Sequence, residues 1–268
     1  MSDYDYIIVG AGSAGCVLAN RLSKNPLNRV LLLEAGGSDR RFYIQMPIGY
    51  GKTYHQKAVN WMYMTEPSPD AGNRPSYWPR GKVLGGSSSI NAMVYVRGNP
   101  KDFDDWHEAG NPGWSFDELL PYFKRMETWQ HGGDDYRGGD GPLKVSDVSS
   151  QLHPLCKNFI SAAKEIGFSF NKDMNGASQE GVGNYQITTH NGQRVSTSRA
   201  YLRPVMSRKN LTVIMNAHVT RILFEGKRAS GVEYKKSGNF NQVNAKQEVV
   251  LSSGAVNSPQ LLQLSGVG

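Results

Sequence analysis

A glycine-rich turn near the start of the chain has the residue types that bind the pyrophosphate of a dinucleotide. Residues 10–15 have the sequence GAGSAG, which follows an apolar run and opens a helical pattern. In such a turn Gly10 permits the tight bend, Gly12 lets backbone amides reach a pyrophosphate, and Gly15 lets the helix pack on the strand. The free amides and the positive end of the helix dipole favour an anion at the same point. The turn therefore predicts a dinucleotide-binding site.

A carboxylate placed further along the chain supports the same interpretation. Glu34 ends the second apolar run, 19 residues after Gly15. A carboxylate in this place accepts hydrogen bonds from adenosine ribose hydroxyls and disfavours a 2′-phosphate. The motif does not choose between NAD and FAD, so an NAD-dependent dehydrogenase stays an alternative at this point.

A second candidate segment, residues 79–98, is rich in glycine and serine. Small residues from Gly85 to Ser89 let the backbone lie against a flat or phosphorylated ligand, and Arg80 and Lys82 add positive charge. Taken by itself, the segment is also compatible with a simple loop before a strand.

Three elements must position the first turn. Residues 4–9 and 30–33 are short apolar runs typical of buried strands, and residues 14–24 have the apolar spacing of a helix. A strand, a helix and a strand in this order imply a parallel sheet. We therefore expect an α/β fold: a Rossmann-like FAD/NAD(P)-binding domain with a parallel sheet, plus part of an α+β substrate domain. Residues 36–80 show no clear period, and we expect an ordered excursion over the surface there.

The later part of the chain adds helices and then strands. Ser115 and Glu118 form a capping-box pattern for a helix over residues 115–129, with Pro121 inside its first two turns, and residues 153–167 predict another helix. A final helix is expected to begin at Ser258 and Pro259, and the chain stops soon after it, so we expect a truncated chain. Strands are expected at residues 185–189, 211–215, 219–225, 230–235 and 248–252.

Composition excludes several classes of protein. The chain has 268 residues with 30 Lys and Arg against 23 Asp and Glu, but the basic residues are scattered, so we expect no nucleic-acid partner. The two cysteines, Cys16 and Cys156, make no disulfide framework. The acidic start is unlike a signal peptide, and the longest apolar run is too short to span a bilayer. We expect a cytoplasmic protein, with peripheral contact to the inner membrane left open.

The histidines and the reactive side chains give no independent site. The six histidines show no metal-ligand spacing, and we expect each to be solvated or packed rather than catalytic: His55, His107, His131, His153, His190 and His218. Cys16 directly follows Gly15, which favours packing over reactivity. No metal site is predicted.

The long motifs of the chain resemble one family. Residues 79–98 resemble the first signature of the glucose–methanol–choline (GMC) oxidoreductases, and residues 254–268 resemble their second signature. Between them, residues 136–143, 191–194 and 222–234 are similar to the choline dehydrogenase and bacterial FAD-dependent alcohol dehydrogenase branch. The resemblance covers essentially the whole chain, and it implies that the cofactor is FAD.

The resemblance also implies where FAD is bound. It places the pyrophosphate at Gly12, Ser13 and Ala14, the adenosine ribose at Glu34, and adenine at the backbone of Val219. Ile90 occupies the place where some relatives attach FAD covalently through a histidine, so non-covalent flavin is expected. Asn60-Trp61 places an aromatic ring either near the flavin or in the core. Together, the cofactor-binding residues expected from the turn and from the resemblance are Gly10, Gly12, Ser13, Ala14, Gly15, Glu34, Val83, Gly85, Gly86, Asn91, Ala92, Met93, Val94, Val219 and Ala255.

The activity implied by the resemblance is oxidation of a primary alcohol, choline or an aliphatic alcohol, to the aldehyde by hydride transfer to flavin N5. The family's catalytic histidine follows the second signature, so no catalytic residue is assigned in this chain. The expected organisation is a FAD-binding domain in two parts, residues 1–150 and 206–268, around a part of the substrate domain, residues 151–205. The alternative is a truncated FAD-binding module that is inactive alone. Neither the electron acceptor nor the oligomeric state can be derived from the sequence.

Overall fold

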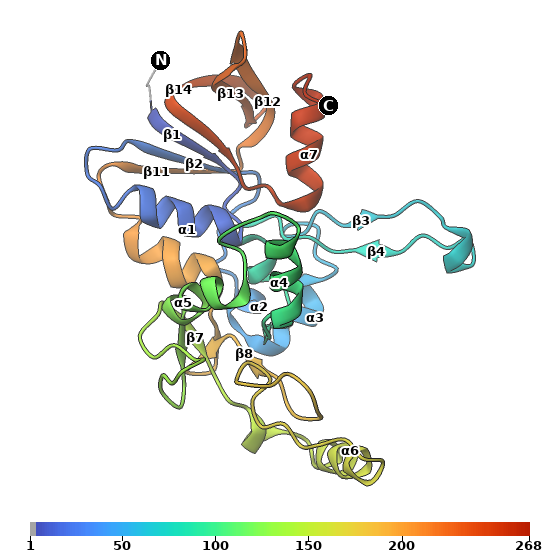
Figure 1. The fold of residues 1–268 in the computed structure, drawn as a ribbon. Helices are drawn as coiled ribbons and strands as arrows, with labels where there is room; N and C mark the ends of the chain where they lie inside the picture. Colours follow the sequence, from blue (N-terminus) through green and yellow to red (C-terminus); the bar gives the residue numbers. More distant parts are fainter. Residues whose placement is uncertain (1–3) are drawn as a thin grey trace. The chain divides into compact units, whose positions relative to one another are not determined.

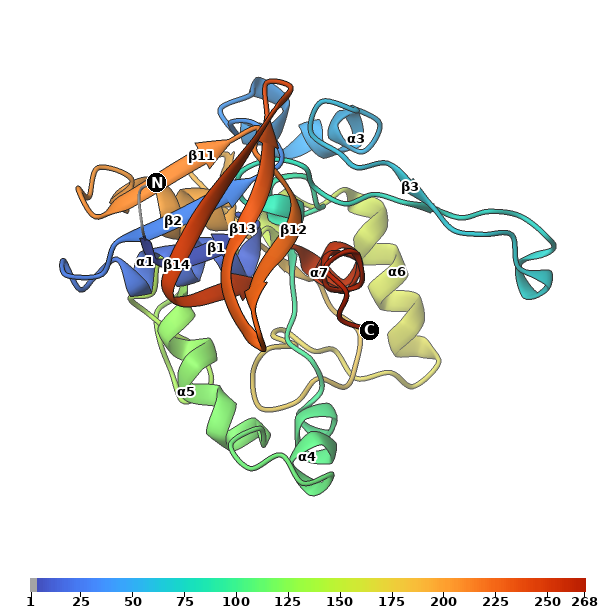
Figure 2. The same ribbon diagram turned by 90° about the horizontal axis from the view of Figure 1, so that it is seen from above.

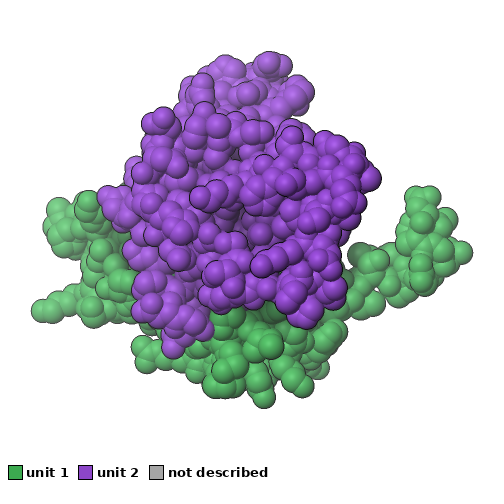
Figure 3. Space-filling model, turned by 90° about the horizontal axis from the view of Figure 1, so that it is seen from below, with its two compact units in different colours: residues 1–92, 194–268 green, residues 93–193 purple. Residues whose placement is uncertain are grey.

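The computed structural model describes residues 4–268, which form two compact units (Figure 3). Of these residues, 4–92 and 194–268 make up unit 1, and 93–193 make up unit 2. The chain therefore leaves unit 1 once and returns to it once. The α/β class predicted from the sequence is confirmed, because helices and a largely parallel sheet alternate in unit 1.

Unit 1 is built around a six-stranded sheet in the order β11-β2-β1-β14-β13-β12 (Figure 1). Strands β11, β2, β1 and β14 run parallel, while β14, β13 and β12 form an antiparallel meander. All five residues of β2 are buried, as is typical of a central parallel strand. The bounds are β1 Tyr4–Val9, β2 Val30–Glu34, β11 Leu211–Met215, β12 His218–Glu225, β13 Arg228–Lys236 and β14 Asn239–Leu251.

Helix α1 (Ser13–Leu22) begins within the glycine turn of residues 10–15, one residue before the predicted start at residue 14. Its inner face consists of the small buried residues Gly15, Cys16 and Ala19, which let the helix approach the sheet closely. Gly12 is the N-cap residue, and no side chain caps the helix. The amides of the first turn therefore lack the side-chain acceptor that most helices provide.

An apolar cluster joins the sheet to helix α7 (Gly254–Leu264). Its buried members include Ile7 and Leu31 from the parallel strands, Ile222 from the meander, and Leu261 from α7. Full burial of such a side chain contributes about 1.5–3 kcal/mol. This cluster fixes α7 beside β12, as both ribbon views show (Figures 1 and 2).

The predicted excursion over residues 36–80 is ordered and includes a long arm (Figure 1). The arm carries paired strands β3 (Tyr63–Met64) and β4 (Tyr77–Trp78). Asn60, which is 1% exposed, holds its root, because Oδ1 accepts hydrogen bonds from the backbone amides of Met62 and Arg80. Short helices and 3-10 turns complete the segment and lead into the first signature: α2 Phe42–Gln45, η1 Pro47–Gly49, α3 Tyr50–Thr53, η2 Pro69–Ala71 and η3 Gly86–Ser89.

Unit 2 contains three longer helices: α4 Pro100–Glu108, α5 Phe116–Met126 and α6 Pro154–Glu165. The capping box predicted from Ser115 and Glu118 is present at the start of α5, and a second capping box starts α4. Short strands lie between the helices and after them: β5 Val94–Tyr95, β6 Glu127–Trp129, β7 Leu143–Val145, β8 Gln186–Ile187 and β9 Thr189–His190. Strand β10 (Gln193–Arg194) lies where the chain returns to unit 1. No helix within residues 4–268 is both long and apolar enough to cross a bilayer.

Several element boundaries predicted from the sequence are wrong. Helix α5 ends at Met126, because Glu127 turns inward to ion pairs and residues 127–129 pair with β7 as a strand. Helix α7 begins at Gly254 and contains Pro259, whereas the sequence pattern predicted a start at Ser258. The Ser258 hydroxyl accepts a hydrogen bond from the backbone amide of the N-cap residue Ser253, at 3.1 Å, from inside the helix. Strand β14 extends well before residue 248, because its polar first half pairs with β13.

A buried ionic cluster lies at the centre of unit 2. Glu127 is fully buried and forms ion pairs with Arg97 at 2.8 Å and Arg137 at 2.9 Å. Arg137, which is also fully buried, reaches Asp173 at 2.7 Å. Because two guanidinium groups face two carboxylates, the buried charge is balanced, and removal of one member leaves another uncompensated.

We expect Glu127→Ala to lower the free energy of unfolding of unit 2 by about 3–5 kcal/mol, because it leaves the buried guanidinium of Arg97 without a carboxylate and that of Arg137 with Asp173 alone. Asp105→Ala is the control, since it breaks the exposed Lys101–Asp105 pair and should change the free energy by less than about 0.5 kcal/mol. Urea unfolding followed by circular dichroism measures both. A Glu127→Ala variant as stable as the control would contradict the role given to the cluster.

Candidate dinucleotide-binding site

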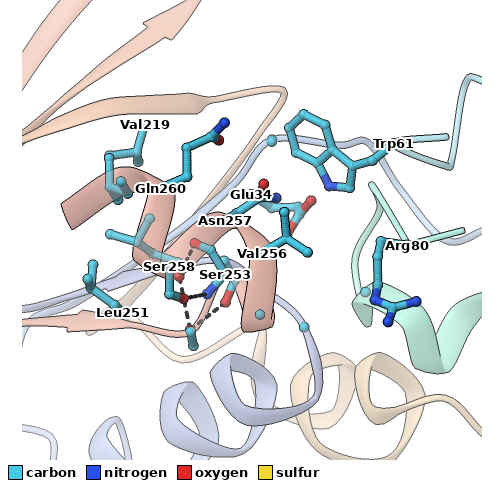
Figure 4. Close-up of a pocket in the computed structure, with 18 of the residues that line it drawn as sticks. Glu34, Trp61, Arg80, Val219, Leu251, Ser253, Val256, Asn257, Ser258 and Gln260 are labelled. Atoms are coloured by element: carbon cyan, nitrogen blue, oxygen red, sulfur yellow. Dashed lines mark hydrogen bonds between the residues drawn. The ribbon is translucent and has the colours of Figure 1, made fainter. Parts of the chain in front are cut away.

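A pocket of about 680 Å³ lies in unit 1 at the carboxyl ends of β1 and β2 (Figure 4). Its walls come from the glycine turn and the start of α1, from the root of the arm, from the start of β12, and from α7. In α/β sheets this edge is where ligands bind, because the loops and helix N-termini that follow parallel strands meet there.

The three motif glycines meet different constraints. Gly10 has φ of +99°, and a Cβ on it would lie 2.7 Å from the carbonyl oxygen of Ser252. A Cβ on Gly15 would lie 1.9 Å from the carbonyl oxygen of Gly10, so only glycine permits this packing of α1. A Cβ on Gly12 would meet only Ser252, at 3.7 Å, and Gly12 lines the pocket. Gly10 and Gly15 are thus required by the fold, whereas at Gly12 the fold itself leaves room for a side chain.

Two serines at the end of β14 fix the turn from behind. The Ser252 hydroxyl lies within hydrogen-bond distance of the carbonyls of Val9, at 3.0 Å, and Gly10, at 2.8 Å. Ser253 also donates to the carbonyl of Val9, at 3.0 Å. The acceptors of the turn are therefore satisfied within the protein, which leaves the pocket side of the turn to its amides.

Glu34 lies in the pocket wall and is 5% exposed. Its carboxylate oxygens accept hydrogen bonds from the backbone amides of Ala11 and Gly36, each at 2.8 Å. Burial raises the pKa of Glu34 from 4.5 to about 7, while the two amides and the charge of Lys82 act in the opposite direction. Glu34 thus ties the end of β2 to the glycine turn and presents a carboxyl group to a ligand.

Aromatic side chains of the arm and of β12 form another wall. The Trp61 ring stacks on Tyr63 at 5.9 Å, meets His218 edge-on at 5.6 Å, and carries the Lys82 ammonium over its face at 4.5 Å. Burial and the nearby Lys82 lower the pKa of His218, which favours a neutral ring at pH 7. Figure 4 shows the Trp61 side chain directed toward Glu34 and Val256.

One hydrogen bond joins the arm to α7. The Tyr63 hydroxyl donates to Oδ1 of Asn257 at 2.5 Å, and both residues line the pocket. Burial is the main cause that raises the pKa of Tyr63, so its hydroxyl keeps its proton near neutral pH. The bond connects residues 194 positions apart, so it closes the pocket between segments that are distant in the sequence.

The structure brings many of the predicted site residues together. Those that line the pocket are Gly10, Gly12, Ser13, Ala14, Glu34, Gly86, Val219 and Ala255. Gly15 lies under the turn, and Val83 is packed in an apolar cluster with Ile44, Val59 and Ile90. Gly85, Asn91 and Ala92 belong to the same unit but do not line the pocket, while Met93 and Val94 belong to unit 2.

Sequence reasoning missed several pocket residues. The sequence did not predict that Tyr63 and Asn257 form a hydrogen bond, because their contact depends on the path of the arm. His218 was expected to be solvated or packed, and its exposed side chain lies at the pocket wall. Its position directly before Val219, the residue assigned to adenine, was the available signal. Among residues 4–268 no cluster of His, Cys, Asp and Glu could hold a metal ion.

The fold and the pocket are those of a protein with a Rossmann-like domain. A parallel sheet, a glycine turn with exposed amides and a buried carboxylate at the end of β2 are the three parts this class requires. Comparisons with known proteins identify the family. The chain belongs to the GMC oxidoreductase family, which it matches over residues 4–268.

Named relatives agree with this assignment. The chain is 50% identical to a mitochondrial choline dehydrogenase of Mus musculus, and this match covers 99% of the chain and 46% of the relative. It is 52% identical to an alcohol dehydrogenase [acceptor] of Pseudomonas putida, with 99% and 48% covered. The chain therefore spans about half the length of the curated relatives it matches.

Solved structures share the fold. A pyridoxine 4-oxidase from Mesorbium loti superposes with a TM-score of 0.95 at 37% identity, covering 99% of this chain and 52% of that one. An FAD-dependent oxidoreductase from Chaetomium thermophilum has a TM-score of 0.91 at 33% identity, covering 99% and 48%. The resemblance to the GMC family seen in the sequence is thus confirmed.

The glycines give a matched pair of variants. We expect Gly12→Ala to change the free energy of unfolding by less than about 1 kcal/mol and to weaken dinucleotide binding at least about tenfold, because its methyl group enters the space between amides and ligand. Gly15→Ala should instead destabilise the fold by about 1–3 kcal/mol or more, because the methyl group meets the backbone of Gly10. FAD titration and thermal unfolding of both variants check this. Equal loss of stability in the two variants would refute the separate roles.

Glu34 predicts a pH dependence of stability. Its folded pKa of about 7 exceeds the ordinary 4.5, so the stabilisation it gives is full below pH 4.5 and is lost as pH rises through 7. The shift corresponds to about 3 kcal/mol. We expect wild type to lose stability relative to Glu34→Gln by about this amount between pH 4.5 and pH 8, as measured by urea unfolding without cofactor. A difference between the two proteins that is constant with pH would contradict the assignment.

Proposed function

We propose that this chain is the FAD-binding part of a flavin-dependent oxidoreductase that oxidises a primary alcohol to the aldehyde. The observation that carries the proposal is the pocket itself, in which the glycine turn, Glu34 and the second-signature helix α7 line one space. Similarity to a choline dehydrogenase, to an alcohol dehydrogenase and to an FAD-dependent oxidoreductase supports FAD over NAD.

We propose that successive residues of the pocket bind successive parts of FAD. We assign the pyrophosphate to the amides of Gly12, Ser13 and Ala14, where the start of α1 has no side-chain cap. We assign the adenosine ribose to Glu34 and adenine to the backbone at Val219. Ala255 is assigned to the ribityl and phosphate region, since it lies in the same wall at the start of α7.

The first signature is assigned to the isoalloxazine and pyrophosphate side of the cofactor. Gly86 lines the pocket beside the glycine turn, and a Cβ on it would lie 2.7 Å from Cα of Gly12. The remaining residues proposed for this side are Val83, Gly85, Asn91, Ala92, Met93 and Val94. Bound flavin supplies the acceptor, at N5, for the hydride that leaves the alcohol carbon.

We propose that FAD is held without a covalent bond. Ile90 stands where some family members carry the histidine that attaches the cofactor, and it is 1% exposed within the cluster of Ile44, Val59 and Val83. An aliphatic side chain in an apolar cluster offers no nucleophile. The other contacts of the pocket, which are hydrogen bonds and packing, must therefore retain the cofactor.

We propose choline or an aliphatic primary alcohol as the substrate, in line with the names of the two curated relatives. We keep residues 1–150 and 206–268 as the FAD-binding parts and residues 151–205 as part of a substrate domain. The compact units, which are defined by how the chain packs, divide instead after residues 92 and 193.

We expect the purified protein to be yellow and to release its flavin on denaturation. Acid precipitation should leave FAD in the supernatant, because no side chain holds it covalently. Absorbance spectra before and after precipitation measure this. A colourless protein that does not take up added FAD would refute the proposal, and flavin that stays with the precipitate would refute non-covalent binding.

Dye-coupled turnover separates the enzyme from a binding module. Reduction of a dye with choline or butanol as substrate would support the oxidoreductase, and the ratio of kcat/KM for the two alcohols would choose between the substrates. A yellow protein that reduces no dye with either alcohol would favour the second candidate, a flavin-binding module without turnover.

A further inference from the structure

Arg194 is a buried cation in unit 1 whose contacts are all neutral oxygen atoms. It is 1% exposed, and its Nε donates to the carbonyl of Ile44 at 3.0 Å. Its Nη1 donates to the carbonyl of Ser88 at 3.1 Å and to Oδ1 of Asn91 at 2.7 Å. Within residues 4–268 no carboxylate forms an ion pair with it, and Nη2 has no hydrogen-bond partner.

An uncompensated buried guanidinium is costly to the fold, because the charge has lost its water without gaining a counter-charge. Burial lowers the pKa of Arg194 to about 10, so the group still carries its charge at neutral pH. Arg137 of unit 2 is also fully buried, but two carboxylates balance it. The guanidinium of Arg137 is balanced by carboxylates, whereas that of Arg194 is not. This difference points to a role for Arg194 beyond packing.

Arg194 holds the wall of the pocket that faces the glycine turn. Ser88, whose carbonyl it contacts, belongs to η3 (Gly86–Ser89), and Gly86 and Ser87 line the pocket. This wall lies directly against the turn, since the Gly85 amide donates to the carbonyl of Ala11 at 2.7 Å. The charge of Arg194 is thus placed behind the segment that lies next to the amides of Gly12.

We propose that Arg194 is a positioning residue of the cofactor pocket, one that fixes η3 from behind and supplies the positive charge that balances the diphosphate of a bound dinucleotide. The inference rests on the proposed function, because it needs a ligand that carries a diphosphate. In the absence of a carboxylate partner, the field of the guanidinium is not cancelled inside the unit, and it adds to the field of the first turn of α1. A diphosphate in the pocket then becomes the counter-charge that the fold itself does not supply.

The test uses two substitutions at Arg194 and one matched control. Arg194→Lys keeps the charge, and Arg194→Gln keeps polar contacts but loses the charge. Neither Arg194 nor Arg208 lines the pocket. Arg208→Gln is the control, because Arg208 is also held by neutral oxygens in unit 1, but these belong to Asn20 and Ser23 at the end of α1 that is far from the glycine turn. Binding of FAD, ADP and uncharged adenosine is measured by titration, and thermal unfolding of each apoprotein is recorded.

We expect Arg194→Gln to weaken FAD and ADP binding about 10- to 100-fold, while adenosine binding changes less than about twofold. Arg194→Lys should stay within about threefold of wild type for ADP. Arg208→Gln should bind all three ligands like wild type, whatever its stability. The proposal is overturned if adenosine binding falls as much as ADP binding, or if Arg194→Lys and Arg194→Gln lose ADP equally, because either result describes a merely structural residue.

The result stays separable from the proposed function. Wild-type protein that binds neither FAD nor ADP would refute the function, whereas wild type that binds both and a Gln variant that binds ADP equally well would refute only the role of Arg194. If Arg194→Gln does not fold, Arg194→Lys decides the matter: a loss of ADP affinity of more than about tenfold in a folded Lys variant overturns the role of the charge.

Discussion

The close approach of helix α1 to the ends of β1 and β14 is the constraint on which the pocket depends. It exists only because Gly15 has no side chain, since a Cβ there would lie 1.9 Å from the carbonyl oxygen of Gly10. Ser252, which directly follows the pairing of β14 with the end of β1, lies within reach of the carbonyls of Val9 and Gly10, so the acceptors of the turn are bonded on the protein side. The amides are then left facing the pocket, and Glu34 can bond one of them, that of Ala11, from β2. One contact between backbones thus sets the polarity of the site.

Buried charged groups are either held in ion pairs or left without one, and unit 1 contains both kinds, since buried Asp39 pairs with Arg203 at 2.8 Å. In unit 2 the carboxylate of Glu127 is neutralised by Arg97 and Arg137, so the ions stabilise one arrangement of the chain and are available to no ligand. In unit 1 Glu34 and Arg194 are buried without an ionic partner, and each contacts the neutral backbone or amide groups around the pocket. Isolated buried charges lower stability. Glu34 lines the pocket, and Arg194 contacts η3, of which Gly86 and Ser87 line it, so these two charges lie at or behind the site at the expense of the stability of unit 1.

Local patterns in the sequence predicted the parallel part of unit 1 well, because short apolar runs and a glycine turn depend on neighbours in the chain. The bounds of β1 and β11 agree with the prediction, and those of α1 and β2 differ by one or two residues. The start of α7 was missed, because Pro259 marks a helix start by local rules while the fold begins the helix five residues earlier. Eight of the predicted cofactor residues line the pocket, whereas the pairing of Tyr63 with Asn257 could not be found without the path of the arm.

The walls of the pocket are held with unequal strength. Helix α7 is fixed by an apolar cluster in which each buried aliphatic side chain contributes about 1.5–3 kcal/mol. The arm is joined to the same pocket by the Tyr63–Asn257 hydrogen bond, a net contribution of about 1 kcal/mol, and by the stack of Trp61 and Tyr63, about 0.5–1.5 kcal/mol. A dinucleotide is long and must enter between these walls. The arm is therefore the wall that can be displaced at the lower cost.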